Sequence, residues 1–255
     1  MWDPELYGRF ADQRNRPFHE LVARIGATAP ANVVDLGCGD GALTATLAER
    51  WPSASVLGVD SSEEMLASAA SRKSDRLSFV LERIEDWRPS GPIDVLVSNA
   101  ALQWVPRHLS LLARFVSALA PRGWLAVQVP GNFEAPSHMT LRTLCNSARW
   151  SDRLGTAGRW PSTPTPSDYI GTLAELGCAV DAWETTYAQV MRGVDPVLTW
   201  MRWTALRPVY ARLSAEETAE FDAELGAMLR EAYPPQPYGT VLPFRLIFAV
   251  AQAPA

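Results

Sequence analysis

The stretch Val33–Trp51, VVDLGCGDGALTATLAERW, decides the fold class of this 255-residue chain. An apolar, strand-like run ends near Asp35, glycines follow at every second position from 37 to 41, and a helix-like pattern then begins. The first glycine lets the chain turn sharply off a strand, and the second lets the backbone come close to a bound molecule. Amide groups at the N-terminus of the next helix can then face a polar or negative group. The stretch therefore predicts a ligand site at a turn between a strand and a helix.

Strand-like and helix-like segments alternate through the first half of the chain. This order predicts an α/β fold with a mainly parallel sheet and helices on both faces. After Pro130 a long stretch rich in proline, serine and threonine predicts a functional insertion or lid. We expect a single domain, whose core covers residues 30–130, 178–190 and 243–253 and whose helical cap covers residues 1–25, 131–176 and 194–233.

Local signals add detail to this outline. Ser61 and Glu64 have the spacing of a capping box at the start of a helix. The acidic segment SAEETAEFDAEL is expected to be a solvated helix face, and His19 and His108 are expected to be surface or packing residues. The expected strands are NVVDL, SVLGVD, LSFVLE, IDVLVSN, GWLAVQVP, CAVDAWETTYAQV and FRLIFAVAQA, and the expected helices are GALTATLAERW, SSEEMLASAASR, HLSLLARFVSALA, SDYIGTLAELG, DPVLTWMRWTALRP and SAEETAEFDAELGAMLREAY.

Composition and charge argue against several classes of protein. The net charge is −5 and hydrophobic residues make up 47% of the chain, which is ordinary for a soluble globule and does not favour nucleic-acid binding. The three cysteines have neither disulfide nor zinc spacing, so we expect no metal and a cytoplasmic location. The N-terminus lacks the apolar core of a signal peptide, and no apolar run is long enough to span a membrane.

An acidic residue lies where a nucleotide-binding turn requires one. Asp60, in LGVDSS, ends the second expected strand, where a carboxylate can accept hydrogen bonds from both hydroxyls of a ribose. The glycines alone do not choose the cofactor, because Gly37-x-Gly39-x-x-Ala42 also matches a dinucleotide fingerprint. Three features favour S-adenosylmethionine instead. Asp35 lies just before the turn, some 30 residues of the chain precede the turn, and the segment VSNAALQWVP follows the fourth expected strand. The chain also lacks the Tyr-x-x-x-Lys pair of a short-chain dehydrogenase.

The segments VVDLGCGDG, GVDSSEEML and VSNAALQWVP resemble the class I S-adenosylmethionine-dependent methyltransferases. The resemblance extends over nearly the whole chain through LYGRFADQRNRP, LAVQVPGNFEAPSH, GCAVDAWETTY, WTALRP and PFRLIFAVA, which are similar to a branch that methylates trans-aconitate. It implies a Rossmann-like sheet of seven strands with an antiparallel last strand, and S-adenosyl-L-methionine as cofactor. The implied cofactor-binding residues are Asp35, Gly37, Cys38, Gly39, Asp60, Ser61, Arg83, Ile84, Asn99, Gln103 and Trp104.

One position departs from the family pattern. The family usually places an acid after the third strand, near the adenine amino group, whereas VLERIEDW has Arg83 there. Glu82 or Glu85 are the alternatives for that role, so the resemblance leaves the adenine contacts open.

The resemblance also implies an acceptor, namely a carboxylate of trans-aconitate or a related small polycarboxylate. A carboxylate is already ionised at pH 7, so no catalytic base is expected and catalysis consists of alignment and removal of water. Arginine forks and neutral donors suit such a substrate. The predicted substrate-binding residues are Tyr7, Arg14, His138, Trp200, Arg207, Tyr238 and Arg245.

Several of these residues have a second interpretation. If DPVLTWMRWTALRP is one helix, Trp200, Trp203, Thr204 and Arg207 share a face and can cap a polar substrate. Alternatively, the tryptophans belong to the core and Arg207 supports the end of the helix. Tyr7 and Arg14 share a face of an expected first helix, which either covers the cofactor or packs on the core. His138 is expected in a loop.

Three other functions stay open on the residues alone. The same fold and cofactor can serve another small acid, phenol or amine. A cofactor-binding domain without catalysis is a second reading, and a dinucleotide oxidoreductase is the third. The expected partners are small molecules only, with no nucleic acid and no membrane, and the expected state is a monomer or weak dimer.

Overall fold

The computed structural model describes residues 11–155, 157, 162–202 and 205–255, with side chains from residue 15 onward. The chain forms two compact units. The first takes in the described residues up to Pro130 together with Pro164–Glu184 and Leu246–Ala255, and the second takes in the described parts of Gly131–Thr163 and Thr185–Arg245. The expectation of one domain with a helical cap stays a prediction.

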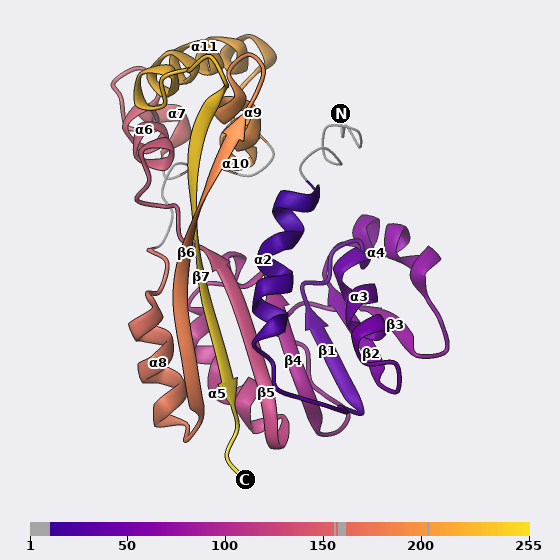
Figure 1. The fold of residues 1–255 in the computed structure, drawn as a ribbon. Helices are drawn as coiled ribbons and strands as arrows, with labels where there is room; N and C mark the ends of the chain where they lie inside the picture. The colour runs from indigo at the N-terminus through magenta and orange to yellow at the C-terminus, as the bar shows by residue number, and fades with distance from the viewer. Residues whose placement is uncertain (1–10, 156, 158–161, 203–204) are drawn as a thin grey trace. The chain divides into compact units, whose positions relative to one another are not determined.

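A seven-stranded sheet in the order β3-β2-β1-β4-β5-β7-β6 organises the fold (Figure 1). The first five strands pair in parallel, and β7 runs antiparallel to β5. This confirms the predicted seven-stranded sheet with its antiparallel last strand. The strands are β1 (Asn32–Leu36), β2 (Ser55–Asp60), β3 (Leu77–Leu81), β4 (Ile93–Asn99), β5 (Leu119–Pro130), β6 (Ala179–Met191) and β7 (Thr240–Gln252).

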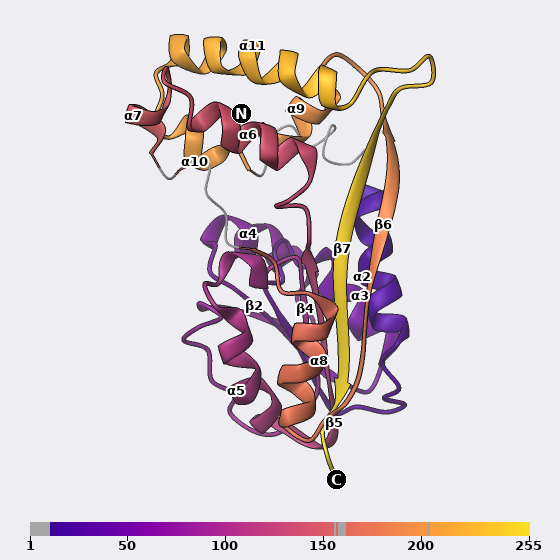
Figure 2. The same ribbon diagram turned by 90° about the vertical axis from the view of Figure 1, so that its left-hand side faces the viewer.

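Helices cover both faces of the sheet within the first unit. Figures 1 and 2 show α2 and α3 on one face and α5 and α8 on the other. Central strands between two helical layers are buried on both faces, which is why four consecutive residues of β4, from Val95 to Ser98, are all buried. The helical elements are α2 (Ala11–Ala23), α3 (Ala42–Arg50), α4 (Glu63–Ala69), η1 (Ala70–Arg72), η2 (Leu102–Trp104), η3 (His108–Leu111), α5 (Leu112–Ser117) and α8 (Pro166–Glu175).

Two local predictions in this unit need correction. Helix α4 is capped by Ser62, whose side chain accepts a hydrogen bond from the Met65 amide, so the predicted cap at Ser61 is one residue early. The segment HLSLLARFVSALA begins as the 3₁₀ turn η3 and continues as the shorter α5. His108, in η3, is a packing residue as expected, because it is buried with Nε2 2.6 Å from the Tyr169 hydroxyl.

The second unit has its own helical core. Helices α6 and α9 pack against α11, and Phe221 and Leu225 of α11 are fully buried between them and their neighbours. A capping box between Ser214 and Glu217 starts α11. The helices are α6 (Pro136–Cys145), α7 (Ser151–Leu154), α9 (Pro196–Arg202), α10 (Arg207–Tyr210) and α11 (Ala215–Ala232).

The acidic face of α11 is not simply solvated. Arg149 pairs with Glu220 and Glu224, which lie one helical turn apart, and Arg202 of α9 pairs with Asp222 at 2.7 Å. The acidic residues therefore anchor neighbouring segments of the second unit. None of these acidic side chains is buried, so the face is solvated as expected, and the ion pairs to Arg149 and Arg202 were not anticipated.

The segment predicted as one helix from residue 195 to 208 is interrupted. Helix α9 ends at Arg202, residues 205 and 206 form a turn, and α10 begins at Arg207. Pro208 explains the new start, because proline lacks the amide that a helix interior needs but is tolerated in a first turn. Trp200 and Arg207 thus belong to different helices, so the predicted common face is wrong. Trp203 and Thr204 lie outside the described residues.

In the part of the chain that the structure describes, no helix combines the length and the apolar character that crossing a membrane requires.

Candidate functional site

The candidate site is built at the carboxyl ends of three neighbouring parallel strands of the first unit. In the β-ladder Asp35 of β1 is opposite Gly58 of β2 and Val97 of β4. The chain order of the strands reverses between β1 and β4. Ligands of open α/β sheets bind at such a switch point, outside the carboxyl ends of the strands.

The glycine turn after β1 has the backbone that its sequence predicts. Gly37, Gly39 and Gly41 have φ values of 82°, 56° and 74°, in the left-handed region that favours glycine. A side chain at Gly37 would clash with the Cβ of Ala101, whereas a Cβ at Gly39 would have no atom within 4 Å. Gly37 is therefore needed for packing, and Gly39 borders open space that a ligand can approach.

Asp60, at the end of β2, is tied to the glycine turn. Its carboxylate accepts a hydrogen bond from the Gly39 amide at 2.8 Å and another from the Ser62 amide at 2.9 Å. Each carboxylate oxygen has a second lone pair, so both can still accept from a ribose diol. The predicted neighbour Ser61 is exposed.

Asp35 is a buried carboxylate beneath the same turn. It is 3% exposed, and its Oδ2 accepts a hydrogen bond from the Thr44 hydroxyl at 2.6 Å. Burial raises the pKa of Asp35 to about 6, with the Thr44 hydrogen bond opposing that rise and the Asp60 charge adding to it. Sequence reasoning missed Thr44, although a hydroxyl in the first turn of the helix after a glycine turn was a usable signal.

Cys38 is a packing residue of the turn. Its side chain is 7% exposed, and burial, together with the charges of Asp35 and Asp60, raises the pKa of the thiol. Its sulfur would lie 2.9 Å from a Cβ placed on Gly58. A thiol held protonated in this way is not a nucleophile, so Cys38 contributes shape and backbone only.

Three predicted residues lie at the end of β4 and just beyond it. The Oδ1 of Asn99 and the Oε1 of Gln103 are buried and have no hydrogen-bond partner among the described residues. The amide nitrogen of Gln103 donates to the Ala100 carbonyl at 2.6 Å, which fixes its orientation. Unpaired buried acceptors are costly, so these two oxygens are free to accept hydrogen bonds from a ligand or from water. Trp104 follows in η2 and is 57% exposed.

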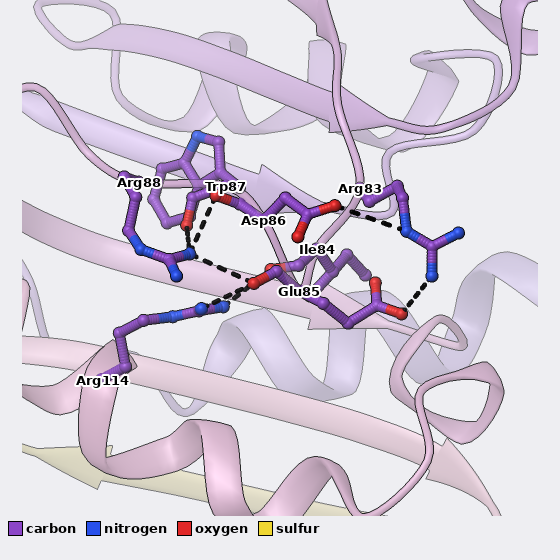
Figure 3. Close-up of polar contacts among 7 residues, drawn as sticks. All are labelled: Arg83, Ile84, Glu85, Asp86, Trp87, Arg88 and Arg114. Carbon is purple, nitrogen blue, oxygen red and sulfur yellow. Dashed lines mark hydrogen bonds and ion pairs between the residues drawn. The ribbon is translucent and has the colours of Figure 1, made fainter.

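The loop after β3 forms a separate polar network (Figure 3). Arg83 pairs with Glu85 at 2.6 Å and with Asp86 at 3.5 Å, so its guanidinium group is directed to acids of its own loop. Ile84 is buried, and its Cδ1 would lie 3.6 Å from a Cβ on Gly37. Ile84 thus packs beside the glycine turn, while Arg83 acts within the loop.

Arg114 of α5 holds the backbone of this loop. It donates to the carbonyl of Ile84 at 2.8 Å and to that of Glu85 at 2.7 Å, and Figure 3 shows both bonds converging from one side of the loop. Arg88 adds a hydrogen bond to the Glu85 carbonyl at 3.1 Å. Sequence reasoning gave no sign of Arg114, because its contacts go to backbone about 30 residues earlier.

In the second unit, some of the predicted acceptor residues line a cavity of about 670 Å³. Tyr238 and Arg245 are in its wall, beside Asn132 and Gln236. Asn132 fixes the backbone of Arg245, since its side chain accepts from the Arg245 amide at 2.8 Å and donates to the Arg245 carbonyl at 3.0 Å. One guanidinium nitrogen of Arg245 donates to the Gly131 carbonyl at 3.2 Å.

Among the described residues, the predicted acceptor residues His138, Trp200 and Arg207 do not line this cavity. His138 lies in α6 rather than in the expected loop, because Pro136 begins a helix there. Its ring packs on Phe133, and burial first and the charge of Arg142 second lower its pKa to about 4, so it is neutral at pH 7. Trp200, in α9, packs edge to face on Phe244 of β7. Arg207, in α10, is exposed. Tyr7 lies outside the described residues, as does the side chain of Arg14 in α2.

Comparisons with known proteins identify the family. A family model described as a methyltransferase domain matches residues 9–196. A trans-aconitate 2-methyltransferase of Rhodococcus jostii is 53% identical over 255 residues, which cover 99% of each chain. The chain belongs to the trans-aconitate 2-methyltransferase family. A second member, from Streptomyces avermitilis, is 49% identical over 100% of this chain and 97% of its own.

Solved structures agree with the methyltransferase fold. The YcgJ protein of Bacillus subtilis matches 94% of this chain and 99% of its own with a TM-score of 0.63 at 13% identity. Phosphoethanolamine N-methyltransferase 2 of Haemonchus contortus, solved with S-adenosylhomocysteine, matches 94% of this chain and 53% of its own with a TM-score of 0.56 at 15% identity. The family match makes the chain an S-adenosylmethionine-dependent methyltransferase, and the solved structures show that it has the class I sheet.

The residues at the strand ends fit this cofactor. The buried Asp35 can offset the positive ammonium group of its methionine part, and Asp60 can accept from its ribose hydroxyls. The open space over Gly39 leaves room for close approach, and the unpaired oxygens of Asn99 and Gln103 can accept ligand N–H groups. These groups come from neighbouring strand ends of one unit, as a single extended ligand requires.

Proposed function

We propose that this enzyme transfers a methyl group from S-adenosylmethionine to a carboxylate of trans-aconitate, or of a closely related small polycarboxylate, to give a monomethyl ester and S-adenosylhomocysteine. The observation that carries this proposal is the 53% identity to a trans-aconitate 2-methyltransferase over 99% of both chains. A match of this extent includes the whole second unit, whereas the match to the generic methyltransferase domain ends at residue 196, inside that unit.

The chemistry places few demands on the protein. S-adenosylmethionine supplies an electrophilic methyl group on a sulfonium. The acceptor carboxylate is ionised at pH 7, since its ordinary pKa is near 4, so the protein need not remove a proton from it. We therefore assign no catalytic base, and the residues of this chain act by binding, by orientation and by excluding water.

The cofactor contacts follow from the strand ends. We propose that Asp35, Gly37, Cys38 and Gly39 hold the methionine part and that Asp60 and Ser61 hold the ribose. Ile84 would border the adenine, and the backbone of the loop that carries Arg83 would border it as well, since the Arg83 side chain is engaged with Glu85 and Asp86. Asn99, Gln103 and Trp104 would lie nearest the sulfonium.

For the acceptor we propose a site that uses residues of the second unit. Tyr238 and Arg245 share a cavity of about 670 Å³, a volume within the range of small-molecule sites. A phenol hydroxyl and a guanidinium group are suitable partners for carboxylates. Tyr7, Arg14, His138, Trp200 and Arg207 stay as further predicted contacts.

We also propose a cytoplasmic location and a monomer or weak dimer. The described cysteines Cys38, Cys145 and Cys178 are free and buried, which supports a reducing compartment.

The direct test is a product assay with the purified full chain. Trans-aconitate, its cis isomer and citrate are each incubated with S-adenosylmethionine, and the product is expected to be a monomethyl ester that mild alkali cleaves.

Two variants test the predicted acceptor contacts. Tyr238→Phe should raise the KM for trans-aconitate several-fold and leave the S-adenosylhomocysteine affinity unchanged. Arg207→Ala, which removes a whole charged side chain, should do the same. Arg192→Ala, at an exposed position of the same unit, is the control. An alkali-stable product, or methylation of a phenol or amine in preference to these acids, would overturn the proposed acceptor.

A further inference from the structure

Thr44 departs from the usual behaviour of threonine in a helix. It is the third residue of α3 and is fully buried, and its hydroxyl donates to Oδ2 of Asp35 at 2.6 Å. Its neighbour Thr46 shows the ordinary arrangement, since that hydroxyl donates to the Leu43 carbonyl of the same helix at 2.7 Å. Thr44 thus uses its single hydrogen on the strand carboxylate rather than on the helix backbone.

The glycine turn brings these two residues together. Gly41, with φ 74°, ends the turn directly before α3, so the first turn of the helix starts close to the end of β1. Asp35 is 3% exposed, and Thr44 is the hydrogen-bond donor that the described part of the chain offers it. Without that donor the buried carboxylate would have no hydrogen-bond partner among the described residues, which is costly for a charged group.

The other ionisable groups near Asp35 work against its ionised form. The Asp60 carboxylate on β2 repels it, and the nearby Cys38 thiol carries no positive charge. On β4 its register partner is the apolar Val97. Among the described residues that face Asp35, Thr44 is therefore the group that stabilises the carboxylate.

We propose that Thr44 is a positioning residue, which keeps the Asp35 carboxylate ionised and aimed at the site so that it can bind the ammonium group of S-adenosylmethionine. The proposal rests on the assignment of Asp35 to the cofactor and is independent of the acceptor. Because the hydroxyl holds one oxygen of Asp35, the other oxygen stays available to the ligand. The residue acts through Asp35 and need not touch the substrate.

The test compares S-adenosylhomocysteine binding by calorimetry from pH 5 to 9 in four proteins: the wild type, Thr44→Val, Thr44→Ser and Thr46→Val. Loss of a hydrogen bond to a charged group should move the pH midpoint of binding upward by about one pH unit in Thr44→Val. The affinity at pH 6 then falls roughly fivefold, while the affinity at pH 9 stays close to that of the wild type. Thr44→Ser keeps the donor and should retain the wild-type profile, as should Thr46→Val.

The outcomes separate positioning from simple packing. An equal loss of affinity at every pH, or an unchanged profile in Thr44→Val, would overturn the proposal. Thr44→Ala removes the same donor and provides a second measurement if the valine variant does not fold. In the Asp35→Asn background, Thr44→Val should have no further effect on the pH profile. If Asp35→Asn alone binds S-adenosylhomocysteine like the wild type at every pH, the assignment of Asp35 itself is wrong, and Thr44 fails with it.

Discussion

The Asp60 carboxylate accepts a hydrogen bond of 2.8 Å from the amide of Gly39, 21 residues earlier in the chain. This bond fixes the glycine turn to the end of the neighbouring strand before any ligand binds. Asp60, which would hold the ribose, therefore also fixes the backbone of the glycine turn, which the methionine part of the cofactor would approach.

Asp60→Ala should weaken S-adenosylhomocysteine binding by about 10- to 100-fold, because hydrogen bonds to a charged group each contribute about 1.5–3 kcal/mol. Titration calorimetry at pH 7.5 measures the effect. The exposed Asp75 offers a matched control, since Asp75→Ala removes the same charge from the turn before β3, at the amino end of a strand rather than at the carboxyl ends that form the site. Equal affinities in the two variants would exclude a ribose contact at Asp60.

Cofactor binding should depend on the ionisation of Asp35, whose pKa is raised to about 6 by burial. Because an ammonium group prefers the ionised carboxylate, the affinity for S-adenosylhomocysteine should fall as the pH drops below about 6. Binding at pH 5.5 should release protons, which calorimetry in buffers of different ionisation enthalpy detects. Asp35→Asn should bind weakly at all pH values, and a pH-independent wild type would contradict this assignment.

The same group should make the free energy of unfolding depend on pH. The folded state holds the proton of Asp35 up to about pH 6, whereas the unfolded chain releases it near 3.8, so this contribution to stability is full below pH 3.8 and is lost as the pH rises through about 6. The loss amounts to about 3 kcal/mol. Urea unfolding of the wild type and Asp35→Asn at several pH values from 4 to 7.5 isolates it, because the other titrating groups are common to both. A constant difference between the two curves would count against the raised pKa.

Two glycines of the turn should respond differently to alanine. Gly39→Ala places a methyl group in open space, so it should cost only about 1–2 kcal/mol of backbone strain but weaken cofactor binding markedly. Gly37→Ala adds a clash with Ala101 and should lower the thermal midpoint much further. Thermal unfolding and calorimetry on both variants test the contrast, and equal loss of stability would show that Gly39 is a packing residue too.

The buried pair of His108 and Tyr169 should matter for stability and not for catalysis. Burial lowers the pKa of His108, so the ring is neutral at pH 7, and its Nε2 lies 2.6 Å from the tyrosine hydroxyl. Tyr169→Phe leaves the histidine nitrogen unpaired and should lower the free energy of unfolding by about 1–3 kcal/mol in urea titrations. The kcat and the S-adenosylhomocysteine affinity of the folded variant should match the wild type, and a selective fall in kcat would assign the pair a catalytic role.

The elements that depend on local pattern could be predicted from the sequence. All seven strands were expected from short apolar runs, and Asp35 and Asp60 were placed at strand ends by their distance from the glycines. The cap of α4 moved by one residue, from Ser61 to Ser62, because two adjacent serines offer nearly the same signal.

The contacts between distant segments could not be predicted in the same way. The hydrogen bonds of Arg114 to the loop after β3 depend on how α5 packs, and no periodicity within α5 reveals them. The break between α9 and α10 was missed because an apolar face at helical spacing continues through it. The turn residues Ala205 and Leu206 are buried in the core of the second unit, so tertiary packing overrides the local helical preference there.

The two units have a consequence for engineering by recombination. The chain passes from one to the other at four points, after Pro130, Thr163, Glu184 and Arg245. Two of these junctions fall inside β6 and β7, so neither unit corresponds to one uninterrupted piece of the gene. Grafting the second unit of a homologue onto this core therefore requires two simultaneous exchanges with in-register splices in the middle of strands, and a single-crossover chimera would leave mismatched halves.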